Sequence, residues 1–302
     1  VVENKRLVWT NVLLPGYRPA DFSTVDTADC AAFAFTAVIT LDRPGDLNTI
    51  VPPMLDELED AVRKATADAK VKVIVLQGAG RSFCGGFNFS GGFHQWDNAI
   101  ATDSQWDAGK DMVMVTHQQL GWVPRFMSLW RTPKPVIAQV HGWCVGGGSE
   151  MALCADIVIM AEDAKIGYPP ARVWGCPTTA MWVFRIGAEK AKRMLLTGDL
   201  IDGRQAKEMG LVYDAVPAAE LDEVVDALAS RMAGVPKNQL MMQKLMINQA
   251  YENMGLASTQ MIATLFDGIT RHSPEGMWFK AYSEEHGFHE AVRLRDSGEP
   301  IP

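Results

Sequence analysis

The chain has 302 residues, of which 48% are hydrophobic and 21% are charged, a composition typical of globular proteins that bury a core. Its net charge of -8 and the lack of a Lys and Arg cluster argue against nonspecific binding to nucleic acid or to anionic membranes. Apolar stretches are interrupted well before the length that spans a bilayer, and no export signal follows Val1. We therefore expect a cytoplasmic protein.

Five cysteines form an odd set without CxxC spacing, which is typical of reduced thiols inside the cell. Cys84 and Cys144 flank glycine-rich turns, and we expect them to be small packing residues rather than nucleophiles. Because no group of Cys, His and acidic residues has metal-ligand spacing, we also expect no metal site.

Regular structure is expected to begin after residue 31, because residues 1–31 show no sustained period and are interpreted as an N-terminal extension. The β-branched run at 35–41 predicts a strand that ends in a turn at 43–46. Residues 52–67 predict a helix with Pro52 and Pro53 at its start, and 71–76 predict a buried strand.

A second cycle of the same kind follows. We predict a helix over 112–130, a strand over 135–140, a helix that opens at 146–150 and a strand over 157–160. Strands that alternate with helices indicate parallel sheets with helical crossovers, hence an α/β core over 32–216. Helical patterns at 221–232, at 240–251 and onward to about 295 then predict a C-terminal helical region over 217–302.

Two glycine-rich turns, at 78–88 and 141–150, each follow a predicted strand. Glycine permits positive φ and lets the backbone itself approach a ligand. In the second turn, Gly146 to Gly148 run into a helix whose first N–H groups lack acceptors and carry partial positive charge. An N–H group from the first turn, placed beside them, would complete a site for negative charge on a carbonyl oxygen.

The ordered combination of these turns with their flanking segments resembles the crotonase family, also called the enoyl-CoA hydratase/isomerase superfamily. The resemblance rests on residues 41–44, 47–48, 82–88, 134–138, 141–142, 146–156, 164–167, 192–198, 206–210 and 212–217. It covers nearly all of residues 35 to 217, and is far more specific than a single glycine motif.

This resemblance implies a spiral of ββα units with a C-terminal helical region, assembled as a homotrimer or a dimer of trimers. It implies an enzyme, a lyase or isomerase, whose partner is an acyl-CoA substrate and whose only coenzyme is the CoA of that substrate. The oxyanion-hole N–H groups would belong to Phe87 and Gly147. Substrate-binding positions would be Gly85, Gly86, Asn88, Gly146, Tyr168 and Pro170.

Glu150 falls on the position of one of the two catalytic glutamates of hydratases in this family. It lies three residues past Gly147, about one helical turn, so its carboxylate can reach substrate carbons beside the oxyanion hole. We predict that Glu150 transfers protons. The alternative is a glutamate that only complements the helix dipole.

The second hydratase glutamate is absent. Where the family has a segment of the form Phe-Gly-x-Pro-Glu, residues 166–172 read Ile-Gly-Tyr-Pro-Pro-Ala-Arg, so the equivalent is Pro170 or Ala171. Neither transfers a proton, which weakens the hydratase interpretation and leaves isomerisation, hydrolysis or slow hydration open. Replacement acids could be Tyr168, His94, His117 or Asp97, of which His94 is preferred, although each is more typical of a structural residue.

Three functions therefore remain from the sequence. The first is an enzyme of the enoyl-CoA hydratase/isomerase type, with an acyl pocket for a bulky or cyclic group lined by tryptophans from 93–130. The second is a hydrolase of an acyl-CoA or a β-dicarbonyl compound, and the third is a non-catalytic acyl-CoA-binding member. Ser149 is rejected as a nucleophile because Met151 stands where a nucleophile elbow needs glycine, and Asp156 is expected to anchor the core.

Overall fold

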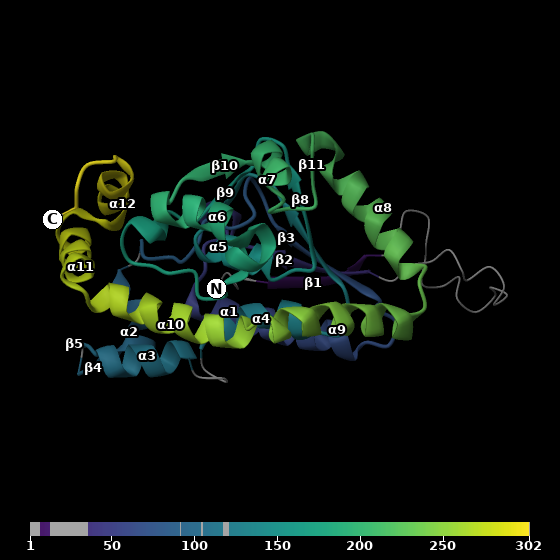
Figure 1. Cartoon of the computed structure of the whole chain (residues 1–302), viewed down its shortest axis with the longest axis horizontal. Helices are drawn as coiled ribbons and strands as arrows, with labels where there is room; N and C mark the ends of the chain where they lie inside the picture. Colours follow the sequence, from purple (N-terminus) through teal and green to yellow (C-terminus); the bar gives the residue numbers. More distant parts are fainter. Residues whose placement is uncertain (1–6, 13–35, 91, 104, 117–120, 302) are drawn as a thin grey trace, which may run out of the picture.

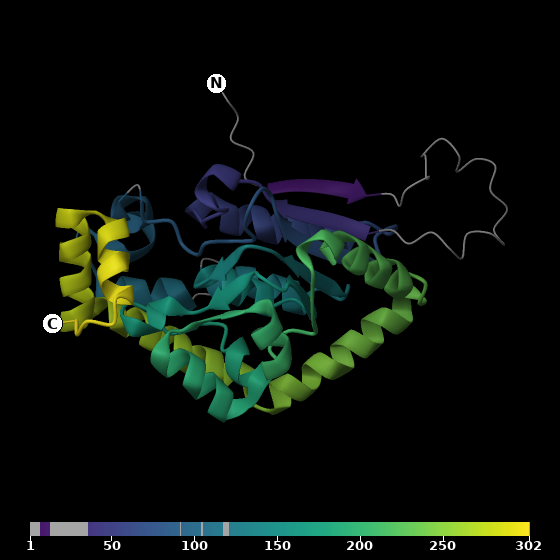
Figure 2. The same ribbon diagram turned by 90° about the horizontal axis from the view of Figure 1, so that it is seen from above.

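The computed structural model describes residues 7–12, 36–90, 92–103, 105–116 and 121–301. Within them the larger sheet has the order β1-β2-β3-β6-β8-β11. Its strands are β1 (Leu7–Val12), β2 (Thr36–Leu41), β3 (Val73–Gly78), β6 (Val136–Val140), β8 (Ile157–Ala161) and β11 (Asp214–Val216). All neighbours pair in parallel except β1, which runs antiparallel to β2 (Figure 2).

Burial along the strands explains this order. In β2 the buried residues alternate, at Ala37, Ile39 and Leu41, whereas every residue of β6 is buried. A strand that is buried on both faces belongs in the middle of a parallel sheet covered by helices. Parallel neighbours also require crossovers, which here are helical: α1 (Pro52–Ala67) connects β2 to β3, and α4 (Trp122–Arg131) precedes β6.

A smaller sheet has the order β10-β9-β7 and consists of β7 (Trp143–Val145), β9 (Lys165–Gly167) and β10 (Leu200–Asp202). Twice, a strand of the larger sheet is followed by one of the smaller sheet and by a helix, in β6-β7-α5 (Gly147–Leu153) and in β8-β9-α6 (Met181–Thr197). This ββα repetition around a parallel sheet confirms the predicted crotonase-like α/β fold.

The remaining elements connect or cover these sheets. They are η3 (Pro44–Asp46), η4 (Phe93–Trp96), α2 (Asp97–Ile100), β4 (Ala101–Thr102), β5 (Gln105–Trp106), α3 (Ala108–Thr116), η5 (Pro169–Arg172), α7 (Gly203–Met209), η6 (Ala218–Glu220), α8 (Leu221–Ala233), α9 (Lys237–Asn253), α10 (Leu256–His272), α11 (Pro274–His286) and α12 (Phe288–Asp296). Helices α9 and α10 run one after the other along one side of the molecule, and α11 and α12 pack together beyond them (Figure 1). In the described ranges, no helix combines the length and apolar character needed to cross a membrane.

Two differences from the sequence predictions stand out. The single helix predicted over 112–130 is wrong, because Gly121 has an extended backbone (φ -71°, ψ 151°) and α4 starts only after it. Strand β1 was missed, since the residues around it show no sustained period. The division of the chain at residues 31 and 216 stays a prediction.

Candidate active site

The two glycine-rich turns meet in space. The N–H of Cys84 donates to the Trp143 carbonyl oxygen at 2.9 Å, and the N–H of Val145 donates to the Cys84 carbonyl oxygen at 3.1 Å. A Cβ built on Gly86 would lie 3.0 Å from the Val145 carbonyl oxygen and 3.8 Å from the Gly147 nitrogen, and Gly86 has φ +92°. Glycine is therefore required at Gly86, where the first turn lies directly against the start of α5.

Two backbone N–H groups at this junction are left without acceptors. Ile50 pairs with the first turn on both sides of Phe87, donating to Gly86 and accepting from Asn88, each at 2.8 Å. In parallel pairing the residue between two bonded neighbours directs its own N–H to the opposite side, so the N–H of Phe87 points away from Ile50. Gly147 is the first residue of α5 and its N–H has no intrahelical acceptor. No acceptor for either N–H is found in the part of the chain that the structure describes.

A cavity of about 350 Å³ lies at this junction. Its walls include every site residue predicted from the sequence, namely Gly85, Gly86, Phe87, Asn88, Gly146, Gly147, Glu150, Tyr168 and Pro170. Aromatic rings form much of the rest, from Phe89, Trp96, Trp106, Trp122, Trp174, Phe279 and Phe288. The rings of Trp106 and Trp174 are stacked with centroids 5.3 Å apart, so this wall is flat and apolar.

Glu150 lies in the first turn of α5, lines the cavity and is 2% exposed. Its Oε1 accepts hydrogen bonds from the Thr178 hydroxyl and from the Thr179 N–H, each at 2.8 Å. Burial raises the pKa of Glu150 to about 8, and the nearby charge of Asp267 acts in the same direction. A carboxyl group with a pKa near neutrality can both give and accept a proton during turnover.

A buried charged cluster on α10 was missed from the sequence. Asp267 and Arg271 line the cavity, and Arg271 Nη1 donates to Asp267 Oδ2 at 2.5 Å. Arg271 also donates to both oxygens of Asp111, at 2.8 and 2.9 Å, and Asp111 accepts from His272 Nε2 at 2.9 Å. These residues belong to no recognisable motif, because the sequence of α10 predicts a helix and nothing more. The tertiary fold brings them to the glycine-rich turns.

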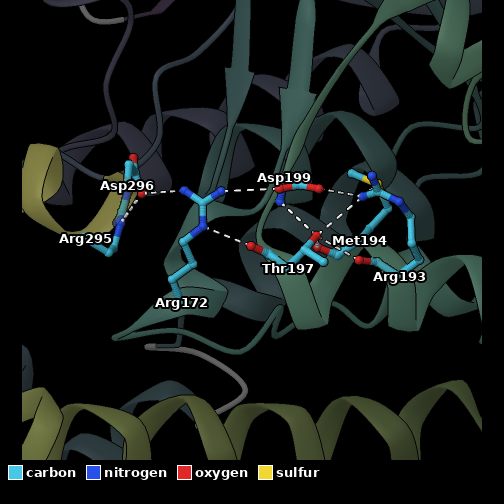
Figure 3. A network of polar contacts seen from close by, with 7 residues as sticks. All are labelled: Arg172, Arg193, Met194, Thr197, Asp199, Arg295 and Asp296. Atoms are coloured by element: carbon cyan, nitrogen blue, oxygen red, sulfur yellow. Dashed lines mark hydrogen bonds and ion pairs between the residues drawn. The ribbon is translucent and has the colours of Figure 1, made fainter. Parts of the chain in front are cut away.

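The last helix closes one rim of the cavity. Arg295 and Asp296, at the end of α12, line it. Arg172 of η5 donates to Asp296 Oδ1 and to the Thr197 carbonyl oxygen, each at 2.9 Å, and pairs with Asp199 at 3.4 Å (Figure 3). These contacts fasten α12 to η5 and to the end of α6. The helix α12 is thereby held in place as part of the cavity wall.

Residues 34–290 match the family model for enoyl-CoA hydratase/isomerase. The chain belongs to the enoyl-CoA hydratase/isomerase family. The crotonase resemblance seen in the sequence is thereby confirmed.

Solved and curated relatives of this family cover most of the chain. The crystal structure of an enoyl-CoA hydratase from Mycobacterium smegmatis is 45% identical, with a TM-score of 0.79 over 87% of this chain and 90% of that one. A putative enoyl-CoA hydratase from Thermus thermophilus is 28% identical over 78% of this chain and 89% of its own length. A hydroxycinnamoyl-CoA hydratase-lyase from Pseudomonas fluorescens is 29% identical over 65% of this chain and 68% of its own length.

The segment in which the sequence predicts no second glutamate brings Pro170 to the second glycine-rich turn. A Cβ on Gly146 would lie 3.5 Å from Pro170 Cγ, so the proline ring borders the start of α5. Tyr168 donates its hydroxyl proton to the Cys176 carbonyl oxygen at 3.1 Å. The structure does not place His94, the preferred replacement acid, at the cavity that holds Glu150. His94 is exposed and, like Asp97, lines a different cavity. His117 lies outside the described residues.

Other residues considered from the sequence have structural partners. Asp156 accepts from the Val136 N–H and from Lys244 Nζ, each at 2.7 Å, which confirms that it anchors the core. Ser149 is buried and donates to the Gly146 carbonyl oxygen at 2.7 Å. Burial raises the pKa of the Cys84 thiol to about 12, so the reactive thiolate is suppressed at neutral pH.

Proposed function

We propose that the chain processes an acyl-CoA thioester by stabilising its enolate oxygen between the N–H groups of Phe87 and Gly147, with Glu150 as acid and base. The observation that carries this proposal is the approach of the first glycine turn to the start of α5, beside a buried carboxyl group in a shared cavity. CoA enters as part of the substrate, and no further cofactor is proposed.

The chemistry follows from where charge develops. When a proton leaves or joins the carbon next to the thioester, negative charge forms on the thioester oxygen in the transition state. Backbone N–H groups that are already in place stabilise that charge without reorganisation, and one such donor is typically worth ~10²–10³-fold in rate. Glu150, one helical turn past Gly147, is placed to move the proton.

The cavity wall supports an acyl group that is flat and apolar. Stacked and edge-on rings, such as Trp106 with Trp174 and Phe87 with Trp96 at 5.4 Å, favour an aromatic or cyclic substituent. One relative is named for a hydroxycinnamoyl-CoA, which is an aryl enoyl thioester. We therefore propose an aryl or cyclic enoyl thioester and its 3-hydroxyacyl partner as the substrate class.

The test is a panel of thioesters followed by two signals. We expect dehydration of 3-hydroxy-3-phenylpropanoyl-CoA, seen as the absorbance of the conjugated thioester, without release of free CoA thiol. 3-Hydroxybutanoyl-CoA, which is small and has no ring, serves as the matched comparison and should be a poorer substrate. Thiol release without the absorbance change would replace this proposal by a hydrolase, and tight binding without turnover of any thioester would replace it by a binding protein.

We also propose that the chain assembles as a homotrimer or a dimer of trimers. Exposed apolar side chains gather along α9 and α10, namely Met242, Leu245, Met246, Ile247, Met261, Ile262, Phe266 and Ile269. A patch of this kind on a folded chain supports burial against another copy. Sedimentation equilibrium should give the mass of three or six chains, and a monomer at micromolar concentration would contradict the proposal.

A further inference from the structure

Hydration of an enoyl thioester needs two proton movements. The attacking water loses a proton as its oxygen bonds to the β-carbon, and the α-carbon gains one. Hydratases of this family divide the work between two glutamates, but Pro170 borders the glycine turn where the second would stand. If Glu150 starts protonated and supplies the α-carbon, the proton of the attacking water is left without an acceptor.

We propose that Asp267 of α10 is the second carboxylate of the reaction, supplied from a different element than the missing glutamate. This inference rests on the proposed function and names the residue that completes it. Asp267 lines the same cavity as Glu150 and is 4% exposed.

One short segment holds both carboxylates. Thr178 and Thr179 donate to Oε1 of Glu150, each at 2.8 Å, and the N–H of Cys176 donates to Oδ1 of Asp267 at 3.0 Å. A carboxylate oxygen can accept two hydrogen bonds, so each Asp267 oxygen keeps capacity for a water molecule in the cavity. The segment from Cys176 to Thr179 therefore sets the position of one carboxylate relative to the other.

The charges around the two groups give them different tasks. Arg271 contacts Asp267 at 2.5 Å, whereas no cation contacts Glu150 in the described ranges. Burial raises the pKa of both carboxyl groups, but Arg271 opposes that rise at Asp267 alone. A pair with unequal surroundings divides into an acid and a base. The guanidinium of Arg271 favours the ionised form of Asp267, which acts as the base in the proposed division, while Glu150 supplies the proton as the acid.

With two carboxyl groups, both proton transfers of hydration have a donor and an acceptor. Asp267 takes a proton from water as the water oxygen bonds to the β-carbon. The electron pair of the carbon–carbon double bond moves toward the thioester oxygen, which the N–H groups of Phe87 and Gly147 hold as an enolate. The enolate collapses as Glu150 gives its proton to the α-carbon. The proton on Asp267 returns to Glu150 through water in the cavity before the next turnover.

The test separates water addition from α-proton exchange. Asp267→Asn keeps the size of the side chain and an oxygen for Arg271, but it removes the base. We expect ~10²–10⁴-fold slower hydration and dehydration. Exchange of the α-protons of 3-phenylpropanoyl-CoA with D2O requires only Glu150 and the oxyanion hole, so it should persist in this variant. Equal loss of both reactions, or unchanged hydration, would overturn the assignment.

The matched control is Asp111→Asn. Asp111 contacts the same guanidinium but does not line the cavity, so its loss perturbs the ion-pair cluster without removing a group from the site. We expect hydration by this variant to stay close to that of the unaltered chain. If Asp111→Asn slows hydration as much as Asp267→Asn, the cluster only supports the fold and the proposal fails.

A variant that fails to fold and a loss that depends on the substrate are also distinguishable. If Asp267→Asn does not fold, Asp267→Glu keeps the charge and shifts the carboxylate by one methylene, and the same split between slowed hydration and retained exchange is expected. If the loss is confined to substrates with a polar terminal group, Asp267 serves in recognition and the proposal is overturned. Absence of α-proton exchange in the unaltered chain would instead reject the proposed function itself.

Discussion

Glu150→Gln should slow α-proton exchange and enoyl hydration by ~10²–10⁴-fold while acyl-CoA binding changes little. Glutamine has nearly the same shape as glutamate, and its side-chain oxygen can still accept from Thr178 and Thr179, which now hold Glu150 Oε1 at 2.8 Å. Only the titratable proton is lost. Proton NMR in D2O measures the exchange, and calorimetric titration with the thioester measures binding. Exchange at an unchanged rate would remove Glu150 from the mechanism.

The slope of kcat/KM against pH should be negative for enoyl hydration and positive for α-proton exchange. Hydration starts with protonated Glu150, so its kcat/KM should fall as the pH rises through the Glu150 pKa of about 8. Exchange starts with ionised Glu150, which removes the α-proton, so its kcat/KM should rise through the same pH range. Dehydration should follow the hydration profile, because the enzyme forms that begin the two directions carry the same number of protons. Both slopes near pH 8 should vanish in Glu150→Gln.

Gly147→Ala should lower kcat by ~10²–10³-fold, the usual cost of losing one oxyanion donor. Alanine suits the first turn of a helix, so the backbone at Gly147 loses nothing by intrinsic preference. The new Cβ would, however, lie 2.6 Å from Phe87 Cε2 and 3.0 Å from Ile50 Cδ1. Relief of that contact must move the Phe87 ring, and we expect the backbone of Phe87 to shift with it and to change the spacing of the two N–H groups. Steady-state kinetics with the preferred aryl thioester measure the loss.

Gly45→Ala is the matched control for this substitution. A Cβ at Gly45 would meet no atom within 4 Å, and the residue does not line the cavity. We expect kcat to match that of the unaltered chain. Thermal unfolding of both variants should show whether the fold is intact. If Gly147→Ala folds normally and retains full kcat, the spacing between Phe87 and Gly147 does not matter and the oxyanion hole lies elsewhere.

Local sequence patterns predicted the parts of the fold that depend on local periodicity. Helix α1 was predicted at its observed limits because Leu55, Leu58 and Val62 repeat at helical spacing behind Pro52. The strands of the smaller sheet are three residues long and carry no comparable period, so β7, β9 and β10 were not predicted. Short strands of this kind form because tertiary contacts hold them, which a local pattern does not record.

The residues of the site also differ in whether a local sequence pattern predicts them. Phe87, Gly147 and Glu150 stand in glycine-rich motifs whose spacing is itself the signal, and the structure brings all three to one cavity. Asp267 and Arg271 stand in an ordinary helix, and their importance arises only where α10 crosses the cavity wall. His94, in contrast, follows the first motif closely in sequence yet faces a different cavity. Proximity in sequence was a poor guide to proximity at the site.

In the proposed mechanism, two main-chain N–H groups bind the same thioester oxygen and polarise the thioester carbonyl bond. Difference infrared spectroscopy measures the polarisation of the thioester carbonyl bond directly. The thioester carries a ¹³C label at the carbonyl and is bound to Glu150→Gln, so that turnover is slow. We expect the carbonyl stretch to shift to lower frequency on binding, and to shift less in Glu150→Gln combined with Gly147→Ala. A bound carbonyl with the same frequency as the free thioester in water would contradict the account.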